Sequence, residues 1–133
     1  MALGDFAYCS KLETVNSSTP FGVKYISNAS SYYNPFSGCV ALKEVRFERQ
    51  IAYNDWVFKW SLNLSDATLI SVANALEFGN YTLTLHATAA ARCAAIKGRT
   101  EYDGDGEHFT AADDGDITLE DYITSEGWSI VSG

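Results

Sequence analysis

A chain of 133 residues, 47% hydrophobic and 14% aromatic, is long enough for one domain with its own core and too apolar to be disordered. No apolar run approaches the length of a spanning helix, and the first residues do not form a signal peptide, so we expect no membrane partner and a cytoplasmic location or one in an assembled particle. The net charge of −8 is uneven: residues 1–99 carry 9 bases and 7 acids, whereas residues 100–133 carry 10 acids and no base. We predict a single domain, 1–133, with the acidic segment 100–133 as a candidate subunit-contact region.

The first 38 residues are rich in Ser, Asn and Tyr, and only two short strands are predicted there, at 6–9 and 23–26. The clearest pattern follows at 44–64, where apolar and polar residues alternate, which is typical of half-buried strands. A short turn at 52–55 would join them, so we predict an antiparallel hairpin of strands 39–52 and 56–64. The predicted core residues of the second strand are Trp56, Phe58, Trp60, Leu62 and Leu64.

A helix is predicted at about 66–78, because apolar residues recur at helical spacing after Ser65 or Asp66, either of which can cap its start. The pair Gly79 and Asn80 would end it. Its apolar stripe would cover the aromatic face of the hairpin.

The remaining chain is predicted to be mostly extended. Residues 81–90 alternate again and favour a strand, although the alanine-rich run that follows also suits a helix. Residues 101–116 are acidic and glycine-rich and suggest a long loop, followed by strands near 117–123 and 128–131. The predicted fold is therefore α+β, a predominantly antiparallel β-sheet with one central helix packed on it.

The acidic loop is the candidate metal site, since carboxylate oxygens suit Ca²⁺. Its register is not that of an EF-hand, because a loop starting at Asp103 has His108 where the invariant glycine belongs. We expect at most weak Ca²⁺ binding, and a solvated acidic loop without any cofactor is the open alternative. The candidate ligands are Asp103, Asp105, Glu107, Asp113, Asp114 and Asp116.

The chain contains no motif of a hydrolase, zinc enzyme or phosphate-binding loop, and its three cysteines form no CxxC pair, so no enzyme is predicted. Arg46 and Lys59 would lie on the polar face of the hairpin and are candidate nucleic-acid contacts. Cross-strand ion pairs on a solvated face are the alternative for the same residues.

These features predict a non-enzymatic structural subunit that self-assembles, of the viral coat, tail or filament type, with nucleic acid as cargo if it is a coat protein. The candidate subunit contacts are Lys43, Arg46, Arg49, Lys59, Trp128, Ile130 and Val131. One alternative is a carbohydrate-binding module that stacks aromatic side chains on sugars beside a Ca²⁺ loop, with Trp56, Trp60, Trp128 or the pair Tyr32 and Tyr33 as the candidates. The other is an acidic inhibitor or immunity-type protein that presents residues 101–121 to a basic partner.

Overall fold

The computed structural model describes residues 11, 13–15, 39–45, 47, 56–104 and 106–132. The strands predicted at 6–9 and 23–26, and the turn predicted at 52–55, lie outside the described residues. None of the helices in the described part of the chain has the length and apolarity needed to cross a bilayer.

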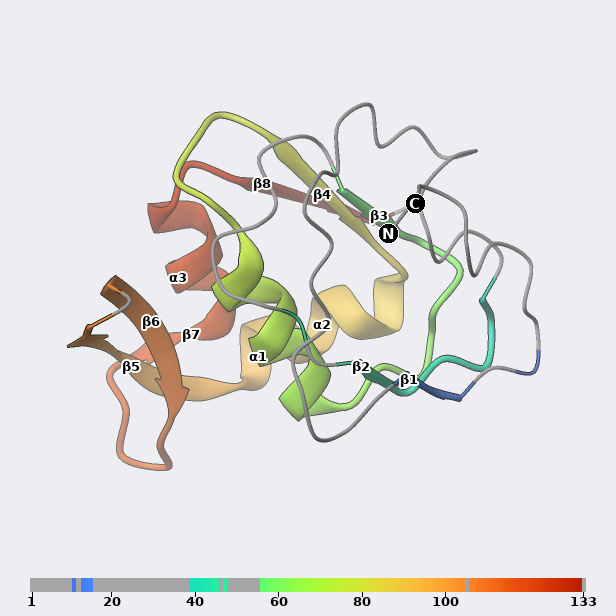
Figure 1. Cartoon of the computed structure of the whole chain (residues 1–133), viewed down its shortest axis with the longest axis horizontal. Helices are drawn as coiled ribbons and strands as arrows, with labels where there is room; N and C mark the ends of the chain where they lie inside the picture. Colours follow the sequence, from blue (N-terminus) through green and yellow to red (C-terminus); the bar gives the residue numbers. More distant parts are fainter. Residues whose placement is uncertain are drawn as a thin grey trace.

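A parallel sheet forms one layer of the fold (Figure 1). It consists of β3 (Trp56–Phe58), β4 (Thr82–Leu85) and β8 (Ser129–Ser132), with β4 in the middle. Parallel neighbours need a crossover connection, and α1 (Asp66–Ala75) provides it between β3 and β4. The second crossover, from β4 to β8, holds all the other elements of the C-terminal half.

That second crossover begins with α2 (Ala87–Ala95) and ends with α3 (Leu119–Ser125). Between the two helices lies an antiparallel sheet at one end of the molecule (Figure 1). In it, β5 (Lys97–Asp103) pairs with β6 (Gly106–Ala111) on one side and with β7 (Ile117–Thr118) on the other. The β5–β6 hairpin therefore occupies most of the segment predicted to be a loop.

Each helix starts at a side chain that accepts a backbone N–H. Ser65 Oγ accepts from Thr68 N at 3.1 Å and caps α1, so Ser65 and not Asp66 is the cap of the two that were predicted. His86 Nδ1 accepts from Thr88 N at 3.2 Å and caps α2. A capping box at Thr118 and Asp121 starts α3.

The helix α1 is fixed by hydrogen bonds as well as by apolar packing. A short parallel ladder of β1 (Thr14–Val15) and β2 (Glu44–Val45) lies beside it, and the N–H of Val45 donates to Thr68 Oγ1 at 3.1 Å. The N–H of Phe47 donates to Ser71 Oγ at 2.8 Å. On the antiparallel sheet, the N–H of Phe109 donates to Asn74 Oδ1 at 2.7 Å, and Asn74 Nδ2 donates to the Phe109 carbonyl at 3.1 Å.

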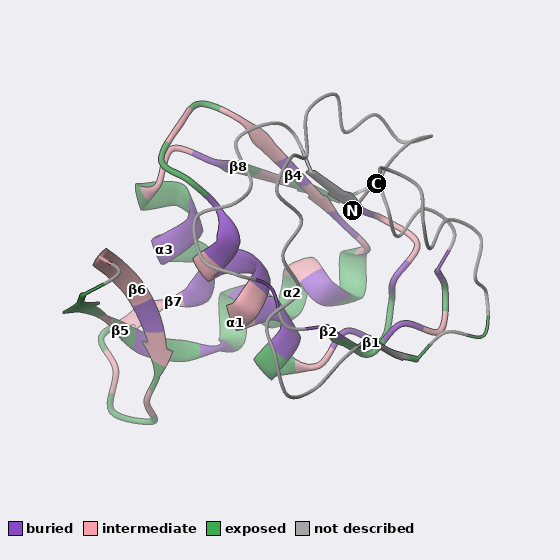
Figure 2. Ribbon diagram, viewed as in Figure 1, coloured by how far each residue is buried: buried purple, intermediate pink, exposed green. Residues whose placement is uncertain are grey.

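The core lies between the parallel sheet, the helices and the inner face of the hairpin (Figure 2). Phe109 packs on Tyr122 of α3 with ring centroids 5.8 Å apart, so the hairpin is attached to the body through an aromatic contact. The largest fully buried side chains are Trp128, Phe58, Phe109, Leu42, Leu69, Leu76, Leu83, Leu85 and Leu119.

The predicted antiparallel hairpin of 39–52 and 56–64 is not seen among the described residues, and 46 and 48–55 lie outside them. In the described residues, β2 pairs in parallel with β1, and β3 pairs in parallel with β4. The second strand also ends at Phe58, so alternation no longer fixes the side chains beyond it: Phe58 and Leu64 are buried, Trp60 is half-buried, and Leu62 is 40% exposed.

Three further predictions need correction. The prediction of one central helix is wrong, because α2 and α3 accompany α1 and because α1 ends at Ala75 rather than near residue 78. The strand at 81–90 stops at Leu85, where His86 caps a helix. The fold is mixed α+β with an antiparallel sheet, but the β3–β4–β8 sheet is parallel, so "predominantly antiparallel" does not describe it.

Candidate functional site

The outer edge of β8 has no neighbouring strand among the described residues. Ser129 N donates to the Tyr81 carbonyl at 2.9 Å, and backbone groups alternate in direction along a parallel ladder. Ser129 and Val131 therefore bond toward β4, whereas Ile130 and Ser132 direct their N–H and C=O groups away from it. No described strand pairs with β8 on that side.

The side chains of β8 divide between core and surface. Ile130 packs against the core and is half-buried, whereas Val131 is 46% exposed and both serines are exposed. Trp128 anchors the start of the strand, since its Nε1 donates to the Glu77 carbonyl at 2.8 Å and its ring lies 5.2 Å from that of Tyr81. The edge is thus held in place before any partner binds.

The predicted subunit-contact residues do not form one surface. Trp128 is 1% exposed and cannot contact a partner, whereas Ile130 and Val131 lie on the β8 edge. Lys43 Nζ is already paired with Glu13 at 2.9 Å. Lys59 Nζ lies 5.0 Å from the centroid of the Trp60 ring, in a cation–π contact.

The predicted basic face of the hairpin cannot be traced in the structure as a whole. Arg46 and Arg49 lie outside the described residues, and no described residue of 39–47 pairs with β3. Of the two candidate nucleic-acid contacts, Lys59 alone is described. Nucleic-acid binding stays a prediction.

The acidic residues of the predicted Ca²⁺ loop separate into two groups. Asp103 and Glu107 lie at the turn of the hairpin, whereas Asp113, Asp114 and Asp116 follow β6 at its other end. The register pairs Asp103 with Gly106 and Gly98 with Ala111, which places the groups about 17 Å apart along β5. Among the described residues, no three or more His, Cys, Asp or Glu side chains gather as metal ligands do. Asp105 lies outside the described residues, and Ca²⁺ binding stays a prediction.

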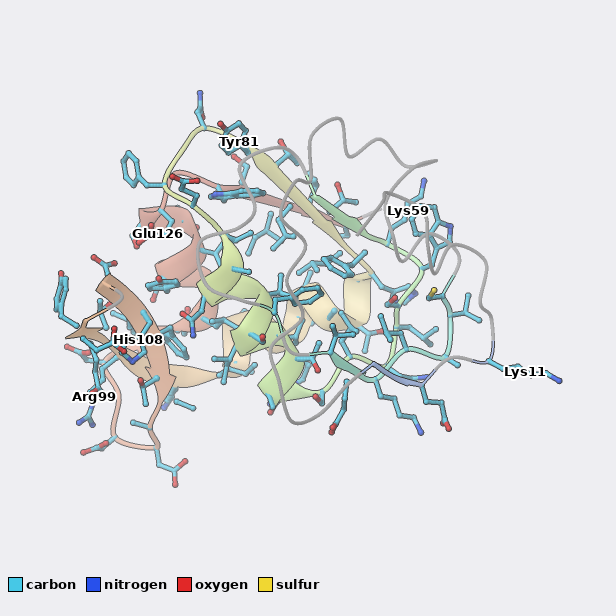
Figure 3. The ribbon with its side chains drawn as sticks, in the orientation of Figure 1. Lys11, Lys59, Tyr81, Arg99, His108 and Glu126 are labelled. Carbon is cyan, nitrogen blue, oxygen red and sulfur yellow. The ribbon has the colours of Figure 1, made fainter. Side chains whose placement is uncertain are left out.

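Two of the separated acids have other partners. Asp114 forms an ion pair with Arg99, both largely exposed. Asp103 Oδ2 lies 3.6 Å from His108 Nδ1 across the hairpin. Figure 3 shows Arg99, His108 and Glu126 at the acidic end of the molecule and Lys11 and Lys59 at the opposite end. The uneven charge of the sequence therefore becomes an uneven charge in space.

One carboxyl close to the hairpin has a raised pKa. It belongs to Glu126, the residue that follows α3, and Glu107 on β6 is among the groups that shift it. Burial, followed by the hydrogen bond and the charge of Glu107, raises the pKa of Glu126 to about 7. Tyr102 OH donates to Glu107 Oε2 at 3.2 Å, and this hydrogen bond raises the pKa of Tyr102. The raised pKa of Glu126 could not be predicted from the sequence, because Glu107 and Glu126 are far apart in the chain.

A pocket of about 530 Å³ opens where α1, α2 and the hairpin meet. Arg92 Nε and Nη2 bond both carboxylate oxygens of Asp66, at 3.0 and 2.7 Å. Lys97 and Asp113 add one charge of each sign to the lining, and Ile70 contributes apolar surface. Two acids and two bases leave the pocket without a net charge, so it favours no single class of charged ligand.

No nucleophilic site is formed by the described cysteines, Cys39 and Cys93, or by His86. Burial raises the pKa of the Cys93 thiol to about 12, with a smaller contribution from the charge of Glu120, which makes it a poor nucleophile. Cys39 is also buried, and the ring of His86 is engaged as the cap of α2. Comparison of the chain with protein-family models, curated proteins and solved structures finds no match, so a function has to be argued from the geometry alone.

Proposed function

We propose that the protein is a non-enzymatic structural subunit that self-assembles, of the kind found in viral coats, tails or filaments, and that the β8 edge is its contact with a second copy. The supporting observation is a strand edge with which no described strand pairs, and at which Ile130 and Ser132 direct backbone groups outward beside the exposed Val131. Such an edge is a ready template for pairing with another chain. A coat protein would add nucleic acid as cargo, and no cofactor is required.

A second β8 fits this edge about a two-fold axis. In antiparallel pairing, Ile130 of one copy would exchange hydrogen bonds with Ser132 of the other, and the reverse, which gives about four new bonds. The two Val131 residues would then face each other at the axis as a non-hydrogen-bonded pair, where side chains approach most closely. The two parallel sheets would become one continuous sheet.

Charge opposes this contact rather than driving it. Each copy carries −8, so two copies repel each other. Salt screens repulsion between like-charged copies. Association through β8 should therefore strengthen with added salt, whereas a contact between the acidic and basic ends of two copies should weaken.

The test combines association with cross-linking. Analytical ultracentrifugation over a range of protein and salt concentrations should show reversible self-association that increases with salt. Val131→Lys should abolish it, and Ser132→Pro, which removes an outward N–H without touching the β4 ladder, should weaken it. Val40→Lys is the matched control, since Val40 is also exposed, at 42%, but lies away from β8.

Cross-linking would then identify the symmetry. Val131→Cys should form a disulfide-linked dimer under mild oxidation because the two residues face each other at the axis, and Val40→Cys should not. A chain that stays monomeric at every concentration and salt, or a Val131→Lys variant that assembles like the parent, would contradict the proposal.

The alternatives have unequal support. The carbohydrate-binding hypothesis loses one of its candidate residues, because Trp128 is buried in the core. A second candidate, Trp60, is half-buried and lies under Lys59. One observation supports the acidic-inhibitor hypothesis. The acidic β5–β6 hairpin lies at the end of the molecule (Figure 1), and its Tyr102 is 76% exposed. A chain that is monomeric in every sedimentation experiment would favour that hypothesis.

A further inference from the structure

The outer edge of β6 has a regular hydrogen-bonding pattern. Among the described strands, β6 pairs with β5 only, and in an antiparallel ladder alternate residues direct both backbone groups away from the partner strand. Ala112 N donates to the Lys97 carbonyl at 3.0 Å, so Ala112 bonds toward β5. The residues that direct their backbone groups outward are therefore Glu107, Phe109 and Ala111.

The backbone of Phe109 shows which chemical group fits this edge. Its N–H donates to Asn74 Oδ1 at 2.7 Å, and its carbonyl accepts from Asn74 Nδ2 at 3.1 Å. A planar carboxamide carries an acceptor and a donor side by side, so it matches the N–H and C=O that one strand residue directs to the same side. One amide group is therefore enough to satisfy one outward residue of β6.

The next outward residue, Ala111, has no such amide beside it. No hydrogen bond from another described residue reaches its N–H or C=O, and Ala111 lines the pocket of about 530 Å³ between α1, α2 and the hairpin. Four helical residues rise by about 6.0 Å, close to the roughly 6.8 Å between alternate strand residues. Ile70, one turn before Asn74, lines the same pocket, but its apolar side chain cannot bond to either backbone group.

The charged side chains of the pocket differ in whether they already have a partner. Arg92 bonds both carboxylate oxygens of Asp66, so these two residues neutralise each other. Lys97 and Asp113 also line the pocket, and neither forms an ion pair with another residue in the described part of the chain. They offer one ammonium group and one carboxylate to a ligand.

The pocket suits a small molecule better than an extended peptide. An added strand would need free backbone groups at successive outward residues, but Asn74 already occupies those of Phe109, the outward residue next to Ala111. The single N–H and C=O pair that remains can take one amide group. The volume of about 530 Å³ also lies within the range of about 300–1,000 Å³ that is usual for small-molecule sites.

We propose that this pocket binds a zwitterionic small molecule that carries a carboxamide, of which free glutamine and asparagine are the simplest. The carboxamide would bond the N–H and C=O of Ala111 as Asn74 bonds those of Phe109. The ligand's carboxylate would lie toward Lys97 and its ammonium group toward Asp113. The proposal does not depend on self-assembly, because α1, α2 and the hairpin form the pocket and β8 takes no part in it.

The first test is an NMR titration of the ¹⁵N-labelled full chain with L-glutamine and with L-asparagine. Saturable shifts of the Ala111 amide are expected with at least one of them. L-glutamate should bind at least about tenfold more weakly than L-glutamine, because its side-chain carboxylate has no donor for the Ala111 carbonyl. Absence of a saturable shift with either amide, or equal binding of L-glutamate and L-glutamine, would overturn the proposal.

Two variants address the contact with Ala111. Ala111→Pro removes the outward N–H without breaking the β5 ladder, since proline is tolerated where the N–H does not face the partner strand. Ile70→Asn places a second amide on α1, one turn before Asn74, where it should occupy the site from within the chain. Each variant should weaken L-glutamine binding by about tenfold or more. Should Ala111→Pro not fold, Ile70→Asn still decides, and unchanged binding in it would contradict the proposal.

Two further variants address the charges. Lys97→Met and Asp113→Asn should each weaken L-glutamine binding by about tenfold, because each removes the partner of one end of the zwitterion. Lys11→Met is the matched control, since it removes the same charge at the end of the molecule opposite to the hairpin (Figure 3), and should leave binding unchanged. Equal binding in Lys97→Met and Lys11→Met would show that the pocket does not hold the ligand's carboxylate, and would refute the assignment.

Discussion

Replacing Asn74 should destabilise the fold much more than a half-exposed polar residue on a helix normally would. Its side-chain amide bonds both backbone groups of Phe109, as the next strand of a sheet would do. Phe109 itself is 1% exposed. In Asn74→Ala, the backbone N–H and C=O of Phe109 would lose their partners in a place where water has poor access.

The size of the loss follows from these two bonds. Each contributes about 0.5–1.5 kcal/mol net, and an unsatisfied buried group costs about 1–3 kcal/mol. Alanine recovers at most about 0.7 kcal/mol through its higher helix propensity. We expect a net loss of about 2 kcal/mol in urea denaturation, or a fall of about 5–10 °C in Tm for a domain of this size.

Asn74→Asp separates the two bonds. The carboxylate still accepts from the Phe109 N–H, but it faces the Phe109 carbonyl without a donor. This variant should be at least as unstable as Asn74→Ala at neutral pH, and should recover part of the loss once the carboxyl is protonated, below about pH 4. Asn63→Ala, in an exposed turn, is the control. A loss below about 0.5 kcal/mol for Asn74→Ala would refute the reasoning.

Two further outcomes are expected. Gly127→Ala should cost about 1–3 kcal/mol, because its positive φ and the adjacent Gly79 carbonyl leave no room for a β-carbon; unchanged denaturation would show that the turn relaxes easily. Cys93, whose thiol pKa is raised to about 12 by burial, should resist a thiol reagent at pH 8 in the folded chain and react once urea unfolds it, which labelling followed by mass spectrometry would resolve; rapid labelling of the folded chain would show that the thiol is not buried.

Local sequence signals were sufficient to predict some elements of the fold, but not which elements lie beside them. The start of α1 was narrowed to Ser65 or Asp66 because a cap depends only on the next few residues. A strand was correctly expected after residue 81, and β8 lies near its predicted position. The alternation at 44–64 was equally clear, yet alternation does not state which strand lies beside it. Among the described residues, the strand neighbours of β2 and β3 are β1 and β4, and the two do not pair with each other.

The acidic hairpin was missed for a different reason. Composition suggested a loop, because glycine and aspartate are rare in strands. Most residues of β5 are exposed, however, so charge on the outer side costs little, and the buried Phe109 supplies the attachment. The raised pKa of Glu126 and the β8 edge could not be predicted at all, since both depend on which elements become neighbours.

The three polar residues of α1 that hold neighbouring strands also limit how the chain can change in evolution. Thr68, Ser71 and Asn74 recur every third residue along one side of the helix and receive the N–H groups of Val45, Phe47 and Phe109. Each helical residue turns the chain by about 100°, so one residue inserted between Thr68 and Ser71 would misalign the contacts on one side of the insertion. The fold can tolerate single substitutions within α1, but not a change in the length of the helix. Insertions and deletions should therefore be confined to the exposed connections elsewhere in the chain.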